Sequence, residues 1–360
     1  MSKRTDHDAT ARYRVIGLGA KGDGLVRRLD DRGGLAPGGE GLEPDNFHVR
    51  YVLPGETIRL SQQTDELALD EVVDASSDRI EAVCRHYGVC GGCAMQHASP
   101  SVYQSWKSDL VRAAFAQRGL APKLSPLVGV GLGRRRRVTL TAMATEPGAP
   151  PVVGFFAAGS HDVVPIQTCV VADDAINDLL PHLTDLAATM APGANGLRFH
   201  VLVADNGVCL DCDGYGRALP AAFRAKLAER AKAMRLVRLT IDGDPVALNG
   251  VPVIHFGTAS VSPYPGAFLQ AAKAAETVMA DAVVAALPKK AKRAADLFCG
   301  MGALTFPLAA KVSVFALDSE AEALQALQTG ERGTQGLKKI DVRRRDLMRD
   351  PLSRKELEPF

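Results

Sequence analysis

The sequence lacks the segments that would place a protein in or across a membrane. No apolar run reaches the roughly 18 residues that a transmembrane helix needs, and the N-terminus has no secretory apolar region. No internal repeat or low-complexity tract interrupts the 360 residues, of which 46% are hydrophobic. We therefore expect a cytoplasmic chain with packed cores, and this length predicts two or three domains.

A disulfide framework is also missing. The chain has seven cysteines, an odd number, and nothing in it indicates secretion. Three of them, Cys84, Cys90 and Cys93, fall within one short stretch, and two glycines separate the last pair. Thiolates this close repel one another unless a metal neutralises them, and glycine lets backbone N–H groups turn toward sulfur. The spacing predicts a metal site, with Cys169 as the fourth ligand.

The arrangement of these ligands favours an iron–sulfur cluster over zinc. Structural zinc usually has two paired C-x2-C arms, whereas here one arm is C-x5-C-x2-C and the fourth cysteine lies far downstream. Cys209 and Cys212 do form a C-x2-C pair, so zinc held by them together with Cys90 and Cys93 is the alternative. We interpret Cys209 and Cys212 as ordinary strand and turn residues.

The net charge of +2 hides two strongly basic stretches, residues 101–140 and 332–355. Both stretches predict a surface on which a polyanion can lie, with solvated charged faces as the alternative. The first contains four consecutive arginines that lead into a predicted strand. They are Arg134, Arg135, Arg136 and Arg137. Guanidinium groups bind phosphates and stack on bases, so we predict that these arginines contact RNA. The alternative is an edge strand whose arginines face water.

The residue pattern divides the chain into three parts. Residues 1–72 contain short strand-like runs separated by glycine-rich turns, which predicts a small β-barrel of OB type. Residues 73–265 combine the cysteine region with a helix at 101–115 and several strands, which predicts an α+β domain. Residues 266–360 begin like a doubly wound α/β domain, with a buried strand, a glycine turn, a helix start and a second strand.

The third part carries the signal for a cofactor. Asp296 precedes a turn that contains Gly300 and Gly302, and the second strand ends in Asp318. Glycines permit a ligand to approach the backbone closely, and the acid accepts hydrogen bonds from ribose hydroxyls. The third glycine of a dinucleotide fingerprint is absent, because Thr305 stands in its place. This difference favours S-adenosylmethionine over NAD.

Taken in order, these motifs resemble the family of RNA 5-methyluridine methyltransferases that act on 23S ribosomal RNA and contain an iron–sulfur cluster. The resemblance runs from about residue 10 to 360 and begins with a barrel similar to a TRAM domain. The cysteine run continues as Ala94-Met-Gln-His97, as in the family. Pro265-Gly-Ala-Phe-Leu-Gln270 resembles the segment whose glutamine contacts the cofactor, although Ala272 replaces a frequent asparagine.

The resemblance implies two cofactors. The first is a [4Fe-4S] cluster with a structural role, held by Cys84, Cys90, Cys93 and Cys169. The second is S-adenosylmethionine, bound by six residues of the third part. They are Gln270, Asp296, Phe298, Gly300, Gly302 and Asp318. The third part would then be the first portion of a Rossmann-like methyltransferase domain.

The resemblance also implies a covalent mechanism and an RNA partner. In the family, a cysteine thiolate adds to C6 of uridine, C5 attacks the sulfonium methyl group, and a base removes the C5 proton. The target base must first flip out of the RNA. We expect a monomer that binds 23S ribosomal RNA and no membrane, with transfer RNA as the alternative substrate.

The chain departs from the family in its catalytic residues. The resemblance predicts a further strand with an Asp-Pro-Pro-Arg type motif, a nucleophilic cysteine and a basic glutamate, and none of these precedes Phe360. We interpret Cys299, in the glycine turn, as a packing residue. We therefore predict no catalytic residue and expect an inactive, C-terminally truncated methyltransferase. The alternatives are a non-catalytic RNA-binding iron–sulfur protein and an iron–sulfur redox protein.

Overall fold

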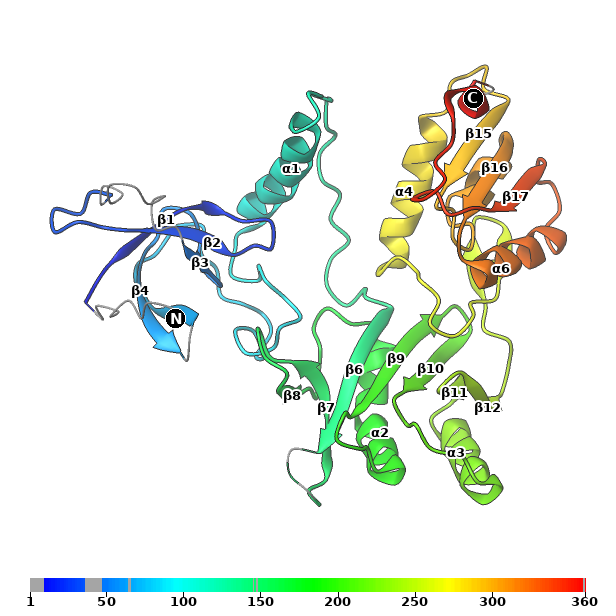
Figure 1. Ribbon diagram of the computed structural model, residues 1–360, viewed down its shortest axis with the longest axis horizontal. Helices are drawn as coiled ribbons and strands as arrows, with labels where there is room; N and C mark the ends of the chain where they lie inside the picture. Colours follow the sequence, from blue (N-terminus) through cyan, green and yellow to red (C-terminus); the bar gives the residue numbers. More distant parts are fainter. Residues whose placement is uncertain (1–9, 36–46, 64–65, 145, 147, 359) are drawn as a thin grey trace. The chain divides into compact units, whose positions relative to one another are not determined.

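The computed structural model divides the chain into two compact units, and Figure 1 labels most of their helices and strands. It describes residues 10–35, 47–63, 66–144, 146, 148–358 and 360. One unit consists of Met1–Val128 and Phe156–Asp162, and the other of Gly129–Phe155 and Val163–Phe360. The chain therefore passes from one unit to the other three times. This grouping differs from the predicted domain boundaries after residues 72 and 265.

The first unit contains a five-stranded antiparallel sheet with the order β3-β2-β1-β4-β5 (Figure 1). Its strands are β1 (Tyr13–Leu18), β2 (Gly24–Arg28), β3 (Phe47–Val49), β4 (Thr57–Gln63) and β5 (Glu66–Asp74). Alternate residues of β1, such as Tyr13 and Val15, are buried in one apolar core, as strand geometry requires. The edge strands β3 and β5 approach each other, so the sheet curls. The predicted strands are confirmed.

An ion pair with a buried carboxylate joins this sheet to the segment that follows it. Glu56 precedes β4 and is fully buried. Its carboxylate accepts hydrogen bonds from Nε and Nη2 of Arg79, each at 2.6 Å, and from the backbone N–H groups of Leu53 and Ser76. Burial alone would raise the pKa of the Glu56 carboxyl, but these hydrogen bonds outweigh burial and hold the pKa below its usual value.

Helix α1 (Pro100–Ala116) closes the first unit and confirms the predicted helix. It begins after Ser99, whose side chain accepts a hydrogen bond from the N–H of Val102. Trp106 donates its indole N–H to the carbonyl of Gly19 at 2.9 Å and packs against the small core around Leu53. The helix is thereby fixed to the turn between β1 and β2.

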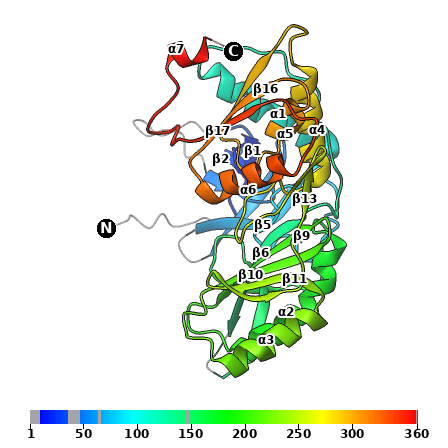
Figure 2. The ribbon, with the colours of Figure 1, turned by 90° about the vertical axis from the view of Figure 1, so that its right-hand side faces the viewer.

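The second unit contains a seven-stranded mixed sheet with the order β12-β11-β10-β9-β6-β7-β8. Its strands are β6 (Arg137–Ala144), β7 (Pro151–Phe156), β8 (Val163–Pro165), β9 (Leu197–Ala204), β10 (Gly207–Asp213), β11 (Leu236–Ile241) and β12 (Asp244–Leu248). Helices α2 (Asp174–Met190) and α3 (Ala221–Ala233) pack along this sheet (Figure 2). All six residues of β11 are buried, because β11 lies inside the sheet and is covered.

The rest of the second unit is an α/β region. It comprises the hairpin β13 (Ile254–Phe256) and β14 (Ala259–Val261), then α4 (Lys273–Ala285), β15 (Arg293–Leu297), α5 (Thr305–Ala309), β16 (Ser313–Asp318), α6 (Ala321–Arg332), β17 (Ile340–Arg344) and α7 (Arg354–Leu357). Strands β15, β16 and β17 form a parallel sheet in that order, as predicted for the start of a doubly wound domain. No helix in the described part of the chain is long and apolar enough to cross a membrane.

We predict that Glu56→Ala destabilises the first unit by about 3 kcal/mol, because it leaves the Arg79 guanidinium without its buried partner. The ionised Glu56 carboxylate stabilises the fold fully when the pH is above the unfolded-state pKa of about 4.3. This contribution is lost as the pH falls through the lower pKa of the folded state. Urea unfolding from pH 3 to 7 measures both effects. The variant should therefore show a smaller loss of stability on acidification.

The exposed pair Arg59–Glu71 of the same sheet provides a matched control. Glu71→Ala should cost less than about 1 kcal/mol, because solvent screens this pair. Equal losses from the two variants would contradict the role assigned to Glu56.

Candidate functional site

The loop that joins β15 to α5 contains the two glycines that were predicted to bind a cofactor. Phe298, Gly300 and Gly302 have positive φ angles of 62°, 53° and 99°. A Cβ atom on Gly302 would lie 2.7 Å from a ring carbon of Phe306, so only glycine fits there. The N–H of Gly300 donates to Oδ2 of Asp318 at 2.8 Å. The loop is therefore tied to the end of β16, where the predicted ribose acid lies.

Asp296 is buried at the end of β15 and has one side-chain partner. The hydroxyl of Thr305 donates to its Oδ2 at 2.5 Å. Burial raises the pKa of the Asp296 carboxyl above its usual value, although the Thr305 hydrogen bond acts in the opposite direction. Thr305, which stands at the position of a glycine in the dinucleotide fingerprint, therefore has a role that the motif does not indicate: its hydroxyl holds Asp296.

Phe298 is the exposed aromatic residue of this loop. The residue is 60% exposed, and its backbone lies in the left-handed region, which is unfavourable for a bulky side chain. Backbone strain of this kind gathers at ligand sites. The position is consistent with the predicted contact to a cofactor.

Gln270 lies in a segment without regular secondary structure, residues 262–272, between β14 and α4. Ala267 and Leu269 of this segment belong to the same apolar core as Cys299 and Met301 of the glycine loop. Shared packing places the Gln270 segment and the glycine loop against one apolar core of the second unit. The six predicted cofactor residues thus belong to one region of the second unit.

The four arginines predicted to contact RNA separate into different environments. Arg134 and Arg135 are exposed, whereas Arg136 is 4% exposed and pairs with Glu276 at 2.7 Å. Arg137 is half-buried, and its guanidinium carbon lies 4.7 Å from the ring centroid of Phe268. The prediction therefore needs a correction for Arg136, which points into the interior because its side chain alternates with those of its neighbours along the extended chain.

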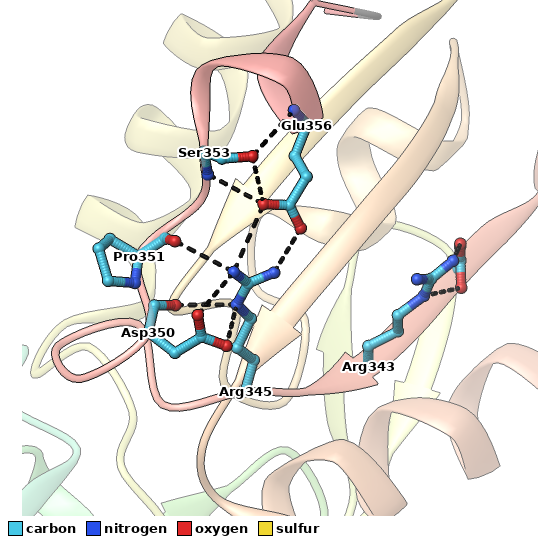
Figure 3. Close-up of polar contacts among 7 residues, drawn as sticks. Arg343, Arg345, Asp350, Pro351, Ser353 and Glu356 are labelled. Carbon is cyan, nitrogen blue, oxygen red and sulfur yellow. Dashed lines mark hydrogen bonds and ion pairs between the residues drawn. The ribbon is translucent and has the colours of Figure 1, made fainter.

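Three arginines of the C-terminal basic stretch are paired with acidic side chains of the same stretch or of the helix that follows it. Arg345 donates hydrogen bonds to the carboxylates of Asp350 and Glu356 and to the carbonyl of Pro351 (Figure 3). Glu356 also caps α7 through Ser353, and these hydrogen bonds lower the pKa of Glu356 to about 2. Arg343 and Arg349 have acidic partners as well. The predicted polyanion surface here is smaller than the charge count indicates.

The cysteine arm folds as a tight turn in the first unit. Cys84, Cys90 and Cys93 are half-buried, and the N–H of Gly92 donates to Sγ of Cys90 at 3.4 Å. The N–H of Gly91 donates to the carbonyl of Phe156, and a Cβ on Gly91 would lie 3.0 Å from that oxygen. Within the described ranges, no three His, Cys, Asp or Glu side chains come together in a way that could hold a metal ion.

Cys169, the predicted fourth ligand, belongs to the second unit. Its backbone N–H donates to Oδ1 of Asn177, and its carbonyl accepts from the same side chain. The geometry of the described residues does not show the predicted cluster site.

The remaining three cysteines are packing residues. Cys209 and Cys212 are fully buried in β10, which confirms their interpretation as strand residues. Burial raises the pKa of the Cys209 thiol to about 11 and raises that of Cys212 further. Cys299 is 7% exposed, and burial together with Asp296 and Asp318 raises its thiol pKa. Thiols of this kind are poor nucleophiles and poor metal ligands.

Bacterial proteins of similar sequence carry the name RNA methyltransferase. One from Brucella suis, itself uncharacterized, is 36% identical over 351 residues, which cover 98% of this chain and 80% of the relative. One from Caulobacter vibrioides is 35% identical, with 95% and 80% covered. The 23S rRNA (uracil(1939)-C(5))-methyltransferase RlmD of Chromohalobacter salexigens is 28% identical, with 87% and 70% covered.

A solved structure shares the fold. The tRNA (uracil-54, C5)-methyltransferase of Pyrococcus abyssi, determined in complex with S-adenosyl-L-homocysteine, matches with a TM-score of 0.65. The match covers 93% of this chain and 79% of that one at 14% identity, which shows a common fold alone. No protein-family model matches the chain.

We predict that Gly302→Ala destabilises the second unit by on the order of 3 kcal/mol, because the new methyl group meets the Phe306 ring at a positive φ. Thermal unfolding measures this loss. Gly336→Ala is the control, because Gly336 has a φ of 81° and a Cβ atom there would meet no other atom within 4 Å. It should cost only about 1 kcal/mol, and a similar cost at both positions would show that Gly302 is not sterically required.

Proposed function

Because the chain belongs to the RNA methyltransferase family of its bacterial relatives, we propose that it binds S-adenosylmethionine for methyl transfer to C5 of a uridine in RNA. The observation that carries this proposal is the hydrogen bond from the Gly300 N–H to Asp318. It places a glycine turn, which a ligand can approach closely, beside a carboxylate at the end of a parallel strand.

Residues from three parts of the second unit would bind the proposed methyl donor. Oδ1 of Asp318 accepts a hydrogen bond from the N–H of Glu320, and Oδ2 accepts one from the N–H of Gly300. These two bonds fix the orientation of the carboxylate, which would accept hydrogen bonds from the ribose hydroxyls. Phe298 offers an exposed ring, and Gln270 an amide from the neighbouring segment. The Pyrococcus abyssi fold neighbour, solved with S-adenosyl-L-homocysteine, supports this class of ligand.

We assign the RNA contact to the surface formed by Arg134, Arg135, Arg137 and Phe268. Phe268 is 65% exposed and lies only two residues before Gln270. Its ring has Arg137 near one side, and exposed aromatic rings of this kind stack on unpaired bases. Arg134 and Arg135 supply positive charge for phosphates. The relative named for 23S rRNA favours ribosomal RNA as substrate, with transfer RNA as the alternative.

In this chemistry a thiol adds to C6 of uridine. We propose that none of the seven cysteines supplies that thiol. Cys209, Cys212 and Cys299 are buried with raised thiol pKa values, so their thiolates are unfavourable near neutral pH. The other four are the proposed metal ligands. We accordingly expect the chain to bind both substrates without completing methyl transfer.

The test measures binding before turnover. Calorimetry should show that the chain binds S-adenosylmethionine and that Asp318→Ala weakens binding about tenfold or more. Asp341→Ala is the control, since this carboxylate on the next strand pairs with Arg343. Absence of binding to the unaltered chain would overturn the function.

Incubation with labelled S-adenosylmethionine and either 23S ribosomal RNA or transfer RNA then tests catalysis. We expect no label at uridine C5. A labelled C5 would retain the function but contradict the exclusion of the seven cysteines, and the labelled RNA would identify the substrate.

We further propose that Cys84, Cys90, Cys93 and Cys169 hold a [4Fe-4S] cluster. Four thiolates suit iron and sulfide chemically, and the Gly92 N–H directed at Cys90 Sγ is the kind of hydrogen bond that stabilises a ligating sulfur. The cluster would serve to shape the fold, and no catalytic step is assigned to it.

Anaerobically purified protein should contain iron and acid-labile sulfide and absorb in the thiolate-to-iron charge-transfer region. Cys90→Ser should remove most of the absorbance, while Cys212→Ser should retain it because Cys212 is buried in β10. Stoichiometric zinc in place of iron would refute the cluster.

A further inference from the structure

The 262–272 segment is irregular, and part of it packs into the interior. The peptide groups of that part need partners inside the protein. Two of these partners are arginine side chains of the seven-stranded sheet, called the central sheet below. Arg238 lies in β11, and Arg136 directly precedes β6. Arg238 donates through Nη1 to the carbonyl of Pro263 at 2.5 Å, and Arg136 donates through Nε to the carbonyl of Gln270 at 3.1 Å. The two ends of the segment are therefore held by different arginines.

Each arginine is itself fixed by a buried carboxylate. Arg238 pairs with Asp211 at 3.1 Å, and their side chains are only 6% and 8% exposed. Asp211 accepts a further hydrogen bond from Thr240 and one from the N–H of Gly266 within the segment. The pair thus holds both a carbonyl and an N–H group near the beginning of the segment.

Arg136 and Glu276 form the second pair, with side chains 5% and 6% exposed. The Arg136 guanidinium donates through Nη2 to Glu276 on α4 and through Nε to Gln270, while its backbone N–H donates to the carbonyl of Ala271. A planar guanidinium can make both side-chain bonds in one fixed orientation, which lysine cannot reproduce. Arg136 therefore connects β6, the Gln270 peptide and α4.

A second contact fixes the same helix. Lys273 in the first turn of α4 pairs with Asp205 at 2.5 Å, and Asp205 also accepts from His255 at 2.7 Å. Lys273 and Glu276 lie one turn apart on α4. The start of the helix that follows Gln270 is therefore held at two positions.

We propose that Arg136 is a positioning residue, which holds the Gln270 backbone so that its amide side chain is preorganised for the methyl donor. This inference rests on the proposed function. A segment already held in its binding conformation loses less conformational entropy when a ligand binds. Stability alone is a weak reason for such a pair, because burying two charges costs nearly as much as their attraction returns.

A double-mutant cycle on the full chain tests the proposal, with the dissociation constant of S-adenosylmethionine as readout. Arg136→Gln and Gln270→Ala should each raise it about tenfold. The double variant should bind no more weakly than Gln270→Ala within about twofold, because both changes remove one positioned amide. Independent effects, multiplying to about a hundredfold, would overturn the proposal. An unchanged dissociation constant in Arg136→Gln would also overturn it.

Two further variants separate positioning from folding. Arg136→Lys keeps a positive charge for Glu276, so its melting temperature should lie near that of the unaltered chain while its dissociation constant stays raised. Recovery of both quantities in Arg136→Lys would show a purely structural ion pair and refute the proposal. Arg79→Gln breaks the buried pair of the first unit and should leave the dissociation constant unchanged.

The same measurements separate this inference from the proposed function. If the unaltered chain does not bind S-adenosylmethionine, the function fails. If it binds and Asp318→Ala weakens binding while Arg136→Gln does not, only the positioning role fails.

Discussion

The organisation of the second unit depends on one constraint: where a chain segment without helix or strand is buried, its peptide groups must find hydrogen-bond partners elsewhere in the protein. The 262–272 segment meets this constraint through guanidinium groups of Arg136 and Arg238 from the central sheet. Each guanidinium requires a carboxylate because an unpaired buried charge is costly. The candidate cofactor residues on this segment are therefore fixed by residues that lie far away in the sequence.

Much of the fold could be predicted from the sequence because its signals are local. Strand runs between glycine turns indicated β1 and β2, and the order of strand, glycine loop and acid indicated Gly300, Gly302 and Asp318. The burial of Arg136 could not be predicted, because its partner Glu276 lies 140 positions later and the arginine run reads as uniform surface charge. The role of Thr305 could not be predicted for a similar reason, because it depends on a hydrogen bond to Asp296 and not on a motif.

The charged and thiol residues show how environment changes the meaning of a motif. A C-x2-C pair is typical of metal sites, yet Cys209 and Cys212 lie in the interior of the central sheet and behave as small apolar residues. The basic C-terminal stretch likewise predicted a polyanion surface, but Arg345 is engaged by Asp350 and Glu356 (Figure 3). In both cases the motif is present in the sequence. Tertiary contacts then determine whether its side chains are accessible to a ligand.

The division of the chain also constrains how the protein is made. Val89 and Gly91 of the cysteine arm pair with the backbone of Ala158 and Phe156, which belong to the same unit but leave the ribosome much later. A stretch of the second unit, residues 129–155, is synthesised in between. Domains usually complete folding in the order of synthesis, but here the N-terminal unit includes the connection at residues 156–162, which is synthesised after part of the second unit. Until that connection has been synthesised, Val89 and Gly91 lack the backbone partners that hold the cysteine arm in the folded unit.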